Sequence, residues 1–474
     1  MEADLGSQSK LRRWARVAWP LAAGLALRLW MLKLVFEVEG DSLLYGALAR
    51  NLLRHGRYAL GGSGGALIPT PLIPTLIRLP GYPLFLAFCF RLFGMDNYYA
   101  ACCVQIALDL AACLLLADYA RRTAPPAQRS SAALATLWLA ALCPFTASYA
   151  ALPLTEAPTL FTLALALWAM ARFREHPGWK NALWFTFAVC ACALLRPDGA
   201  LAAVAFAPAL VIGLPQGKIA PAKLMRMACV CALLALSPFA AWTVRNWKTF
   251  HVVEPLVPRL ANDPGELPQP GWERWVKTWS LDYISTYQIY WNVPGGPFNL
   301  RDLPSRAFDS PAQYAETAAL ADDYEDNGED FLPGLDARFA QLARERIAAH
   351  PLRYYLWLPL GRLADMALRP RVDNLPIDLD WWVYAHHHAE TEFSWAYAAL
   401  NVFYLGLGAA GFCLRPRFRW ALLAYMVLRG AMLALTVAAP ETRYTLEWFP
   451  MLFALGGVAA AAAAHRFLRR SAAG

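Results

Sequence analysis

A group of acidic residues follows the first long apolar stretch of the sequence. Trp14–Phe36 is apolar, and Glu39 and Asp41 come within five residues of its end. If this stretch spans a membrane, both carboxylates lie at the boundary between lipid and water, where they are partly desolvated and still reach a lipid headgroup and a polar acceptor. A carboxylate in such a place can act as a general base. The alternative is that Asp41 only caps the helix that follows, because aspartate is favoured at helix N-termini.

Other titratable side chains are weaker candidates. Glu156 is near the start of a later apolar segment, where an ionisable residue either has a function or serves the structure by pairing with an arginine or capping its helix. His386–His388 could include a metal ligand. The nearest further ligands would be Asp378, Asp380 and Glu390. Three consecutive histidines cannot all face one ion, so we expect no metal and no other cofactor, with a divalent ion as the alternative.

The composition is that of a membrane protein. Of 474 residues, 58% are hydrophobic and 16% are charged, whereas soluble domains contain roughly 25% charged residues. All ten cysteines lie in apolar stretches, so neither a disulfide framework nor a zinc motif is indicated. Much of the excess of Lys and Arg behind the net charge of +8 lies in short loops between apolar segments. The charge therefore indicates membrane topology and not nucleic-acid binding.

Ten apolar segments are predicted to span the bilayer, which takes about 20 residues each. They are 14–36, 98–120, 131–150, 154–172, 180–195, 199–214, 225–244, 393–414, 419–437 and 445–465. Basic residues gather in alternate connections, which the positive-inside rule assigns to the cytoplasm. These residues are Arg12, Arg13, Arg16, Arg121 and Arg122, with further ones in 172–180, 218–226, 415–419 and 466–470. We therefore expect both termini in the cytoplasm.

Two large regions, 37–97 and 245–392, then lie on the external face. Segment 352–368 is apolar but carries charges, each of which costs about 2.5–3.5 kcal/mol at the centre of a span. We predict that it is an interfacial helix, with an eleventh span as the alternative. Segments 41–55 and 82–93, joined by a glycine-rich link, are also predicted to be interfacial. Helical patterns at 311–326 and 335–350 give the external region folded structure of its own.

Several short motifs, in this order along the chain, resemble those of the GT-C glycosyltransferases, specifically the protein O-mannosyltransferase and aminoarabinose-transferase-like branch. The first external loop carries the residues Asp41, Tyr45, Ala49, Asn51, Leu52, Gly56, Tyr58, Arg78, Pro80, Gly81, Tyr82 and Pro83. Later matches in type and order are Pro144–Glu156, Leu195–Gly199, Arg245-Asn246, His350-Pro351 and Pro440–Tyr444. The resemblance covers most of residues 14–250 and is patchy beyond.

The resemblance implies roles for particular residues. In the family an aspartate of the first external loop is the base that deprotonates the acceptor, and it corresponds to Asp41. The family often has Asp-Glu there, whereas this chain has Asp41-Ser42, so Glu39 is a substitute for the second acid. Glu156 corresponds to an acid close to the active-site cavity. Because the donor is a lipid phosphate, arginines are expected to hold it.

Four arginines are predicted on the external side at the ends of spans. They are Arg78, Arg196, Arg245 and Arg443. Their positions would let them converge above the helix bundle and bind the donor phosphate. The alternative for each is an arginine that extends to the interface and anchors a helix end.

The sequence thus predicts an all-α polytopic membrane protein, a GT-C-like bundle of ten or eleven transmembrane helices with external interfacial helices and a partly helical external region. Residues 1–244 form a transmembrane module with the catalytic loop 37–97, residues 245–392 an external region with the interfacial helix 352–368, and residues 393–474 the last transmembrane helices. The predicted partners are a polyprenyl-phosphate sugar donor, the lipid bilayer, and a lipid, glycan or protein acceptor.

The predicted reaction is an inverting sugar transfer on the external face. The alternatives are a lipid or polysaccharide transporter, and a glycan polymerase or ligase that uses diphosphate-linked donors. A composition rich in alanine, with arginine favoured over lysine, indicates a bacterial chain from a GC-rich genome. We therefore expect it in the bacterial plasma (inner) membrane, with the active site facing the periplasm.

Overall fold

The computed structural model describes residues 2–62, 70–215 and 217–471 and confirms the predicted fold class. The chain is an all-α polytopic membrane protein. Among the described residues the strands are β1 (Ala59–Leu60) and β2 (Ile73–Pro74), which form one antiparallel pair in the first external loop. Most of the predicted glycine-rich link falls on residues 63–69, outside the described residues.

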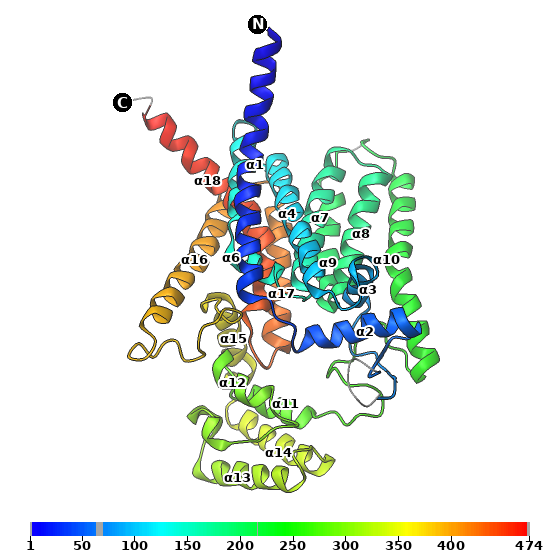
Figure 1. The fold of residues 1–474 in the computed structure, drawn as a ribbon, viewed down its shortest axis with the longest axis vertical. Helices are drawn as coiled ribbons and strands as arrows, with labels where there is room; N and C mark the ends of the chain where they lie inside the picture. Colours follow the sequence, from blue (N-terminus) through cyan, green and yellow to red (C-terminus); the bar gives the residue numbers. More distant parts are fainter. Residues whose placement is uncertain (1, 63–69, 216, 472–474) are drawn as a thin grey trace.

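Each of the ten predicted spans falls on a helix or a pair of helices (Figure 1). These helices are α1 (Glu2–Val35), α4 (Tyr98–Thr123), α5 (Arg129–Ala141), α6 (Pro144–Ala150), α7 (Glu156–Glu175), α8 (Trp179–Leu195), α9 (Ala200–Val211), α10 (Pro221–Phe250), α16 (His388–Cys413), α17 (Arg419–Thr436) and α18 (Phe449–Ser471). In the described part of the chain, six helices are long and apolar enough to cross a membrane alone, namely α1, α4, α10, α16, α17 and α18 together with the turn before it. A seventh span is added if α5 and α6 count as one.

The predicted span at 131–150 falls on α5 and α6, which meet at a bend of 55°. Pro144 begins α6, and the residue before a proline is forced out of the helical conformation; Cys143 is accordingly extended, with φ −71° and ψ 112°. The backbone carbonyl freed at the end of α5 is bound by Arg28 of α1, whose Nη1 donates to the oxygen of Ala141 at 2.7 Å. The charge of Arg28 is balanced by Asp109 of α4, which accepts from its Nε at 2.7 Å.

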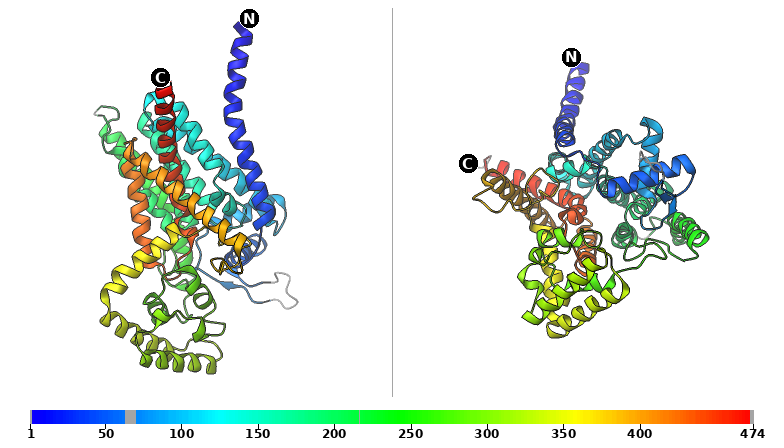
Figure 2. Two further views of the ribbon diagram at one scale, coloured as in Figure 1. Left: turned by 90° about the vertical axis from the view of Figure 1, so that its left-hand side faces the viewer. Right: turned by 60° about the horizontal axis from the view of Figure 1, so that its bottom comes forward.

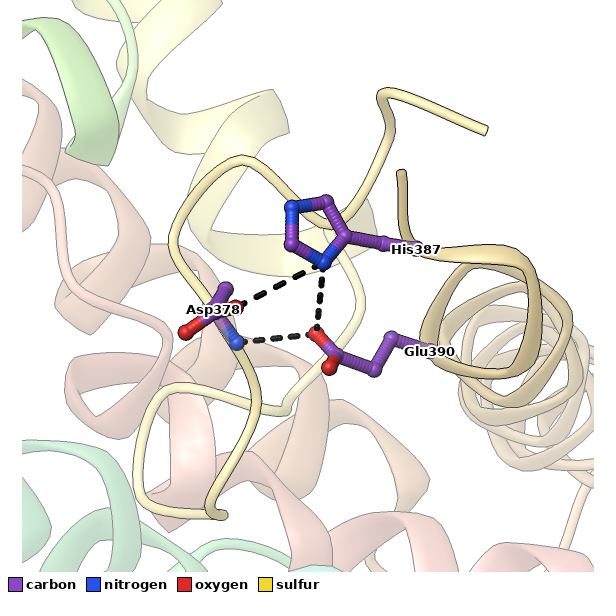
Figure 3. Close-up of side chains that lie close together, drawn as sticks. All are labelled: Asp378, His387 and Glu390. Carbon is purple, nitrogen blue, oxygen red and sulfur yellow. Dashed lines mark hydrogen bonds and ion pairs between the residues drawn. The ribbon is translucent and has the colours of Figure 1, made fainter. Parts of the chain in front are cut away.

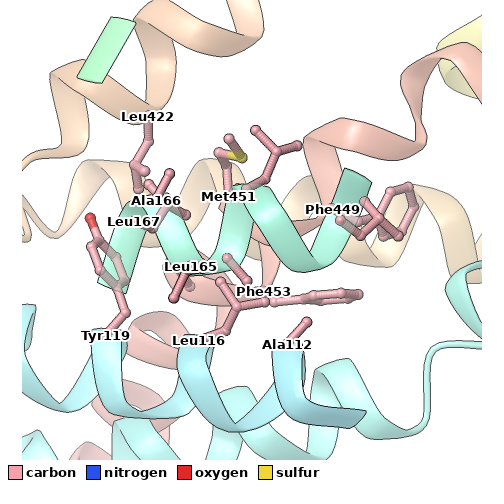
Figure 4. Packing of buried hydrophobic residues seen from close by; sticks show 14 of the residues in the cluster. Ala112, Leu116, Tyr119, Leu165, Ala166, Leu167, Leu422, Phe449, Met451 and Phe453 are labelled. Atoms are coloured by element: carbon pink, nitrogen blue, oxygen red, sulfur yellow. The ribbon is translucent and has the colours of Figure 1, made fainter. Parts of the chain in front are cut away.

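Helix α7 is the centre of the bundle, since most of its residues are buried and it packs against α4, α8 and α9. Figure 4 shows how the apolar faces meet. Ala112, Leu116 and Tyr119 of α4 lie beside Leu165, Ala166 and Leu167 of α7, with Leu422 of α17 and Phe449, Met451 and Phe453 of α18 completing the cluster. This core packs α7 against α8 and α17, and two charged residues described below, Glu156 and Arg196, lie at the ends of α7 and α8.

The first external loop forms two helices, α2 (Asp41–His55) and α3 (Gly81–Phe93), which pack against each other. Figure 1 shows α2 running across the bundle, nearly perpendicular to α1. The ranges match the predicted interfacial segments 41–55 and 82–93. This loop is therefore an ordered layer on the end of the bundle.

Residues 245–392, predicted from the sequence to be external and called the external region below, have their own core. The helices of this region are α11 (Pro270–Lys277), α12 (Tyr283–Tyr290), α13 (Pro311–Asp326), α14 (Pro333–Ala349) and α15 (Leu358–Leu368). Short 3-10 or π turns lie at Pro126–Gln128, Pro197–Gly199, Leu300–Asp302, Ser305–Ala307, Arg353–Trp357 and Thr442–Trp448. Three buried tryptophans, Trp272, Trp275 and Trp279, pack around Phe339 and Phe298. Figures 1 and 2 show this region at the end of the molecule opposite the two chain termini.

The structure bears on two predicted details of the external region. Helices α13 and α14 confirm the helical patterns at 311–326 and 335–350. Segment 352–368 is helical, but it is not among the described helices that are long and apolar enough to span a membrane. Helix α15 packs against α17, and large side chains such as Tyr355 and Trp357 are exposed. The interfacial position of the segment stays a prediction.

Candidate active site

A cavity of about 1350 Å³ lies between the first external loop, the ends of α7, α8, α9 and α17, and the external region. Its charged wall consists of Asp41, Arg78, Glu156, Arg196, Asp198, Arg259, Asp373, Glu441 and Arg443, with Glu37 and Glu39 just after α1. Its apolar wall comes from Leu201 and Val204 of α9 and from Met432, Leu433 and Val437 at the end of α17. Aromatic side chains of the external region, Tyr283, Tyr287 and Trp291, also face it. One cavity thus combines charged, apolar and aromatic surfaces.

Asp41 reaches the cavity because of the turn that precedes it. Gly40 has φ 50° and ψ −121°, a conformation that only glycine adopts without strain, and it turns the chain from α1 into α2. Gly40 occupies the N-cap position of α2, and no side chain there makes a capping hydrogen bond. Asp41 is therefore the first residue of α2 and not its cap. Its carboxylate is directed to the arginines of the cavity wall.

Both carboxylate oxygens of Asp41 are paired with arginines. Arg78 Nη2 donates to Oδ1 at 2.9 Å, and Arg443 Nη1 lies 3.6 Å from Oδ2. Burial acts to raise the pKa of Asp41, but the attraction of Arg78 and Arg443 and the hydrogen bond from Arg78 together outweigh it, so the pKa lies below its usual value. Asp41 is ionised in this state, as a base must be, and one of its oxygens accepts a hydrogen bond from Arg78.

The two arginines come from segments far apart in sequence. Arg78 belongs to the link between β2 and α3, where the hydroxyl of Tyr58 donates to its carbonyl oxygen at 3.0 Å. Gly81 lets this link approach the end of α8, since a Cβ at that position would lie 2.4 Å from the carbonyl oxygen of Leu194. Arg443 lies in the turn before α18, and Glu441 holds its Nε at 2.6 Å. From the sequence, Arg78 and Arg443 were expected to converge with Arg196 and Arg245 above the helix bundle. Arg78 and Arg443 both lie beside Asp41, and their binding of a phosphate stays a prediction.

Glu156 and Arg196 form a second charged cluster in the wall of the same cavity. Arg196 lies 3.3 Å from Glu156, 3.2 Å from Glu447 and 3.5 Å from Asp198. Arg429 of α17 completes the cluster by pairing with Asp198 and, at 2.8 Å, with Glu447. With three carboxylates around it, Arg196 has less positive charge to offer an anion than Arg78 or Arg443. This geometry favours a structural role for Arg196 and for Glu156.

Arg245 and Glu39 belong to neither of the two charged clusters in the cavity wall. Arg245 is not among the residues that line the cavity; it donates to the carbonyl oxygens of Thr75 and Tyr58, each at 2.7 Å, and so supports the loop that carries Arg78. Glu39 lines the cavity but is exposed, and it makes no ion pair with any residue in the described ranges. The structure thus keeps Glu39 near the site without fixing its side chain.

The consecutive histidines at 386–388 contact different residues. His387 Nδ1 lies 3.5 Å from Asp378 and 3.8 Å from Glu390 (Figure 3), and its Nε2 lies 3.2 Å from Asp380. His388 instead stacks on Tyr384 with ring centroids 4.3 Å apart. Asp378, His387 and Glu390 are close enough together to hold a metal ion, yet they do not line the cavity. The absence of a metal stays a prediction.

Several charged residues of the site were not singled out from the sequence. They are Asp198, Asp373, Arg429, Glu441 and Glu447. One signal was available for Arg429, since an arginine inside a predicted span is expected to have a buried partner. Glu441 and Glu447 flank Arg443 in the sequence, but nothing in the spacing of a 3-10 turn shows which side chains face inward. Their roles depend on how α17 and α18 meet, which short motifs do not encode.

Comparisons with known proteins bear on part of the chain. Residues 74–242 match the family described as dolichyl-phosphate-mannose-protein mannosyltransferase, which confirms the resemblance found in the sequence over that stretch. A search of curated proteins finds no match.

Solved structures with a similar arrangement have low sequence identity. The oligosaccharyltransferase of Archaeoglobus fulgidus tethered with an acceptor peptide containing the NVT sequon is 13% identical, with 96% of this chain and 50% of that chain covered and a TM-score of 0.45. AglB from the same organism, in complex with an inhibitory peptide and a dolichol-phosphate, is 12% identical, with coverages of 96% and 51% and a TM-score of 0.46. ArnT from Cupriavidus metallidurans bound to undecaprenyl phosphate is 14% identical, with coverages of 94% and 77% and a TM-score of 0.37. The chain spans about half the length of the archaeal proteins.

Proposed function

We propose that this protein is a GT-C-type glycosyltransferase that moves a sugar from a polyprenyl-phosphate donor to a hydroxyl-bearing acceptor on the external face of the membrane. The observation that carries the proposal is the position of Asp41, whose carboxylate lies between Arg78 and Arg443 at the charged end of a cavity that also has an apolar wall. The family match over residues 74–242 supports the same class of reaction and of donor.

The cavity suits a lipid phosphate on two counts. Arg78 and Arg443 offer guanidinium groups from opposite sides, and arginine binds phosphate oxygens through strong charge-assisted hydrogen bonds. The apolar wall from Leu201 and Val204 of α9 and Met432 of α17 adjoins this charged end and gives the first isoprene units a surface. Val204 is 60% exposed, so this wall reaches the outer surface of the helix bundle, where lipid would lie. A polyprenyl chain could thus extend from the cavity between α9 and α17.

The reaction is a single displacement. The acceptor oxygen attacks the anomeric carbon of the donor from the side opposite the phosphate, and Asp41 takes the proton of the acceptor hydroxyl. The bond between the anomeric carbon and the phosphate oxygen breaks, and polyprenyl phosphate leaves with the electron pair. Arg78 and Arg443 stabilise the negative charge that develops on the phosphate. Attack from the opposite side inverts the configuration of the sugar.

The external region would contribute to acceptor binding. Tyr283 and Tyr287 lie one turn apart on α12 and face the cavity together with Trp291. They form the wall opposite the end of the bundle, so an acceptor that approaches from outside passes them before it reaches Asp41. The site lies at the end of the molecule away from both termini. The basic connections, which are predicted to be cytoplasmic, support a periplasmic position for that end.

The rival transporter function predicts charged residues that line a path through the bundle. Buried charges do occur there, but Arg28 and Asp109 are paired with each other and do not line the large cavity. Arg28 serves the bend between α5 and α6 instead. The geometry therefore supports transfer at one end of the bundle better than passage through it.

The test is release of polyprenyl phosphate by the purified full chain. The protein in detergent receives a mixture of polyprenyl-phosphate sugars and acceptors, and wild type is compared with Asp41→Asn. A matched control is Asp96→Asn, which removes another external carboxylate that is paired with an arginine, Arg50, but does not line the cavity. We expect acceptor-dependent release by wild type and Asp96→Asn, and a loss of about 100-fold or more in Asp41→Asn. Unchanged release by Asp41→Asn would remove Asp41 from the chemistry, and no release with any donor would refute the proposed function.

A further inference from the structure

Asp41, the proposed base, is paired with the two arginines that are proposed to hold the donor phosphate. Arg78 donates to Oδ1 of Asp41 at 2.9 Å, and Arg443 Nη1 lies 3.6 Å from Oδ2. A hydrogen bond to a carboxylate and a positive charge beside it stabilise the ionised form and make it a weaker base. In the state that the structure shows, Asp41 is therefore a weakened base, and a phosphate competes with it for the two guanidinium groups.

The arginines have limited capacity for an additional anion. Arg443 directs its Nε and Nη2 to Glu441, at 2.6 and 3.1 Å, so its Nη1 is the nitrogen that faces Asp41. Arg78 uses Nη1 for the carbonyl oxygen of Ile77 and Nη2 for Asp41. The two arginines and two carboxylates carry no net charge together, so an incoming phosphate gains most from this cluster by displacing a carboxylate.

Of the two carboxylates that contact Arg443, Asp41 is the one that a phosphate displaces more easily. Its contact with Arg443 is a long one at 3.6 Å and its side chain is 30% exposed, whereas Glu441 holds Arg443 with two oxygens and is 14% exposed. Asp41 also follows Gly40, so its side chain is at the very start of α2 and is not held by a neighbouring turn of helix on its N-terminal side.

We propose that binding of the donor phosphate releases the base: the phosphate takes Arg78 and Arg443 from Asp41, and the freed carboxylate then accepts the proton of the acceptor. This inference rests on the proposed function and adds its regulation. It makes the reaction ordered, with the donor bound before a productive acceptor. Without donor, Asp41 stays paired and does not activate a hydroxyl.

The same exchange assists the end of the cycle. After transfer, Asp41 carries the proton and no longer competes for the arginines, while the leaving polyprenyl phosphate has gained negative charge and binds them strongly. When Asp41 loses its proton to solvent, its carboxylate again competes for Arg78 and Arg443 and promotes release of the lipid phosphate.

The test is the affinity of the purified full chain for undecaprenyl phosphate in detergent, measured without acceptor. Asp41→Asn removes the competing carboxylate and keeps the shape of the side chain, so we expect it to bind the lipid about three- to tenfold more tightly than wild type, while it loses transfer. Glu37→Gln is the matched control, because Glu37 also lines the cavity but forms no ion pair with the described residues, so its loss frees no arginine.

The outcomes separate this inference from the proposed function. Tighter binding by Asp41→Asn, with Glu37→Gln within twofold of wild type, supports release of the base. Equal or weaker binding by a folded Asp41→Asn, or equal tightening by Glu37→Gln, overturns the inference and leaves the proposed function standing. If wild type does not bind undecaprenyl phosphate at all, both are refuted. Should Asp41→Asn fail to fold, Glu441→Gln frees Arg443 in its place, and the same tightening is expected.

Discussion

Replacing Arg196 by glutamine should lower stability, whereas replacing Arg443 by glutamine should weaken donor binding, although both arginines face the same cavity. Arg196 is surrounded by Glu156, Asp198 and Glu447, at 3.3, 3.5 and 3.2 Å, and two of these carboxylates are only 2% exposed. Removing one partner of a buried ion pair typically costs about 3–5 kcal/mol, because the remaining charge is left without compensation. Arg196→Gln should therefore lower the melting temperature of the purified protein by roughly 3–5 °C.

Arg443→Gln should instead weaken donor binding. Glu441 and Asp41, the partners of Arg443, are 14% and 30% exposed, so water can partly compensate for its loss and the change in melting temperature should be small. A hydrogen bond to a charged group contributes about 1.5–3 kcal/mol, so the affinity for undecaprenyl phosphate should fall by about 10- to 100-fold.

Two assays decide between these roles. Thermal unfolding followed by tryptophan fluorescence gives the melting temperatures, and binding of undecaprenyl phosphate to the folded fraction gives the affinities. If Arg196→Gln kept the wild-type melting temperature and lost donor binding to the extent of Arg443→Gln, then Arg196 would be a phosphate ligand as first predicted, and the structural role inferred from its three carboxylates would be refuted.

Three further predictions concern the bend, the loop and the base. Arg28→Met should destabilise the protein by about 3–5 kcal/mol, and adding Asp109→Leu should recover part of that loss in thermal unfolding, because the double variant leaves no unpaired buried charge; no recovery would contradict the pairing. Gly81→Ala places a Cβ 2.4 Å from the carbonyl oxygen of Leu194, so it should lower the melting temperature by displacing the loop, and an unchanged value would show that the loop adapts freely. The arginines hold the pKa of Asp41 below its usual value in the free protein, and donor phosphate should neutralise them and raise it. Activity is lost as pH falls through the pKa of the base. The acid limb of kcat/KM for the acceptor, measured at saturating donor, should therefore lie at higher pH than the acid limb of kcat/KM for the donor. Coincident limbs would contradict release of the base.

Much of this fold follows from hydrophobic patterning. The ten apolar segments and the short helices at 41–55, 82–93, 311–326 and 335–350 were predictable because each has the periodicity and length of a helix. The bend at Cys143 was not predicted as such, although Pro144 gave a sufficient signal, because a continuous apolar stretch favours one straight helix in a reading by hydropathy alone. Helix α9 is also shorter than its predicted span, since it ends at Val211.

The site residues within recognisable motifs were predictable from the sequence, whereas those whose position depends on how helices pack were not. Asp41, Arg78 and Glu156 belong to motifs with a family resemblance, and all three line the cavity. Arg245 has the same residue type and the same kind of position at a span end, yet its guanidinium binds backbone carbonyls of the loop. Whether an arginine at a span end faces a cavity or supports a loop depends on the rotation of its helix against its neighbours. That rotation is set by packing between distant segments, which a single sequence does not display.

The most direct test of the account is a structure of the full chain with undecaprenyl phosphate bound, determined in lipid nanodiscs. The account predicts the phosphate within hydrogen-bond distance of Arg78 and Arg443, the lipid chain along the wall formed by α9 and α17, and the carboxylate of Asp41 turned away from both arginines toward the aromatic side of the cavity. A phosphate bound elsewhere, or a lipid phosphate in the cavity with Asp41 still paired to both arginines, would contradict it.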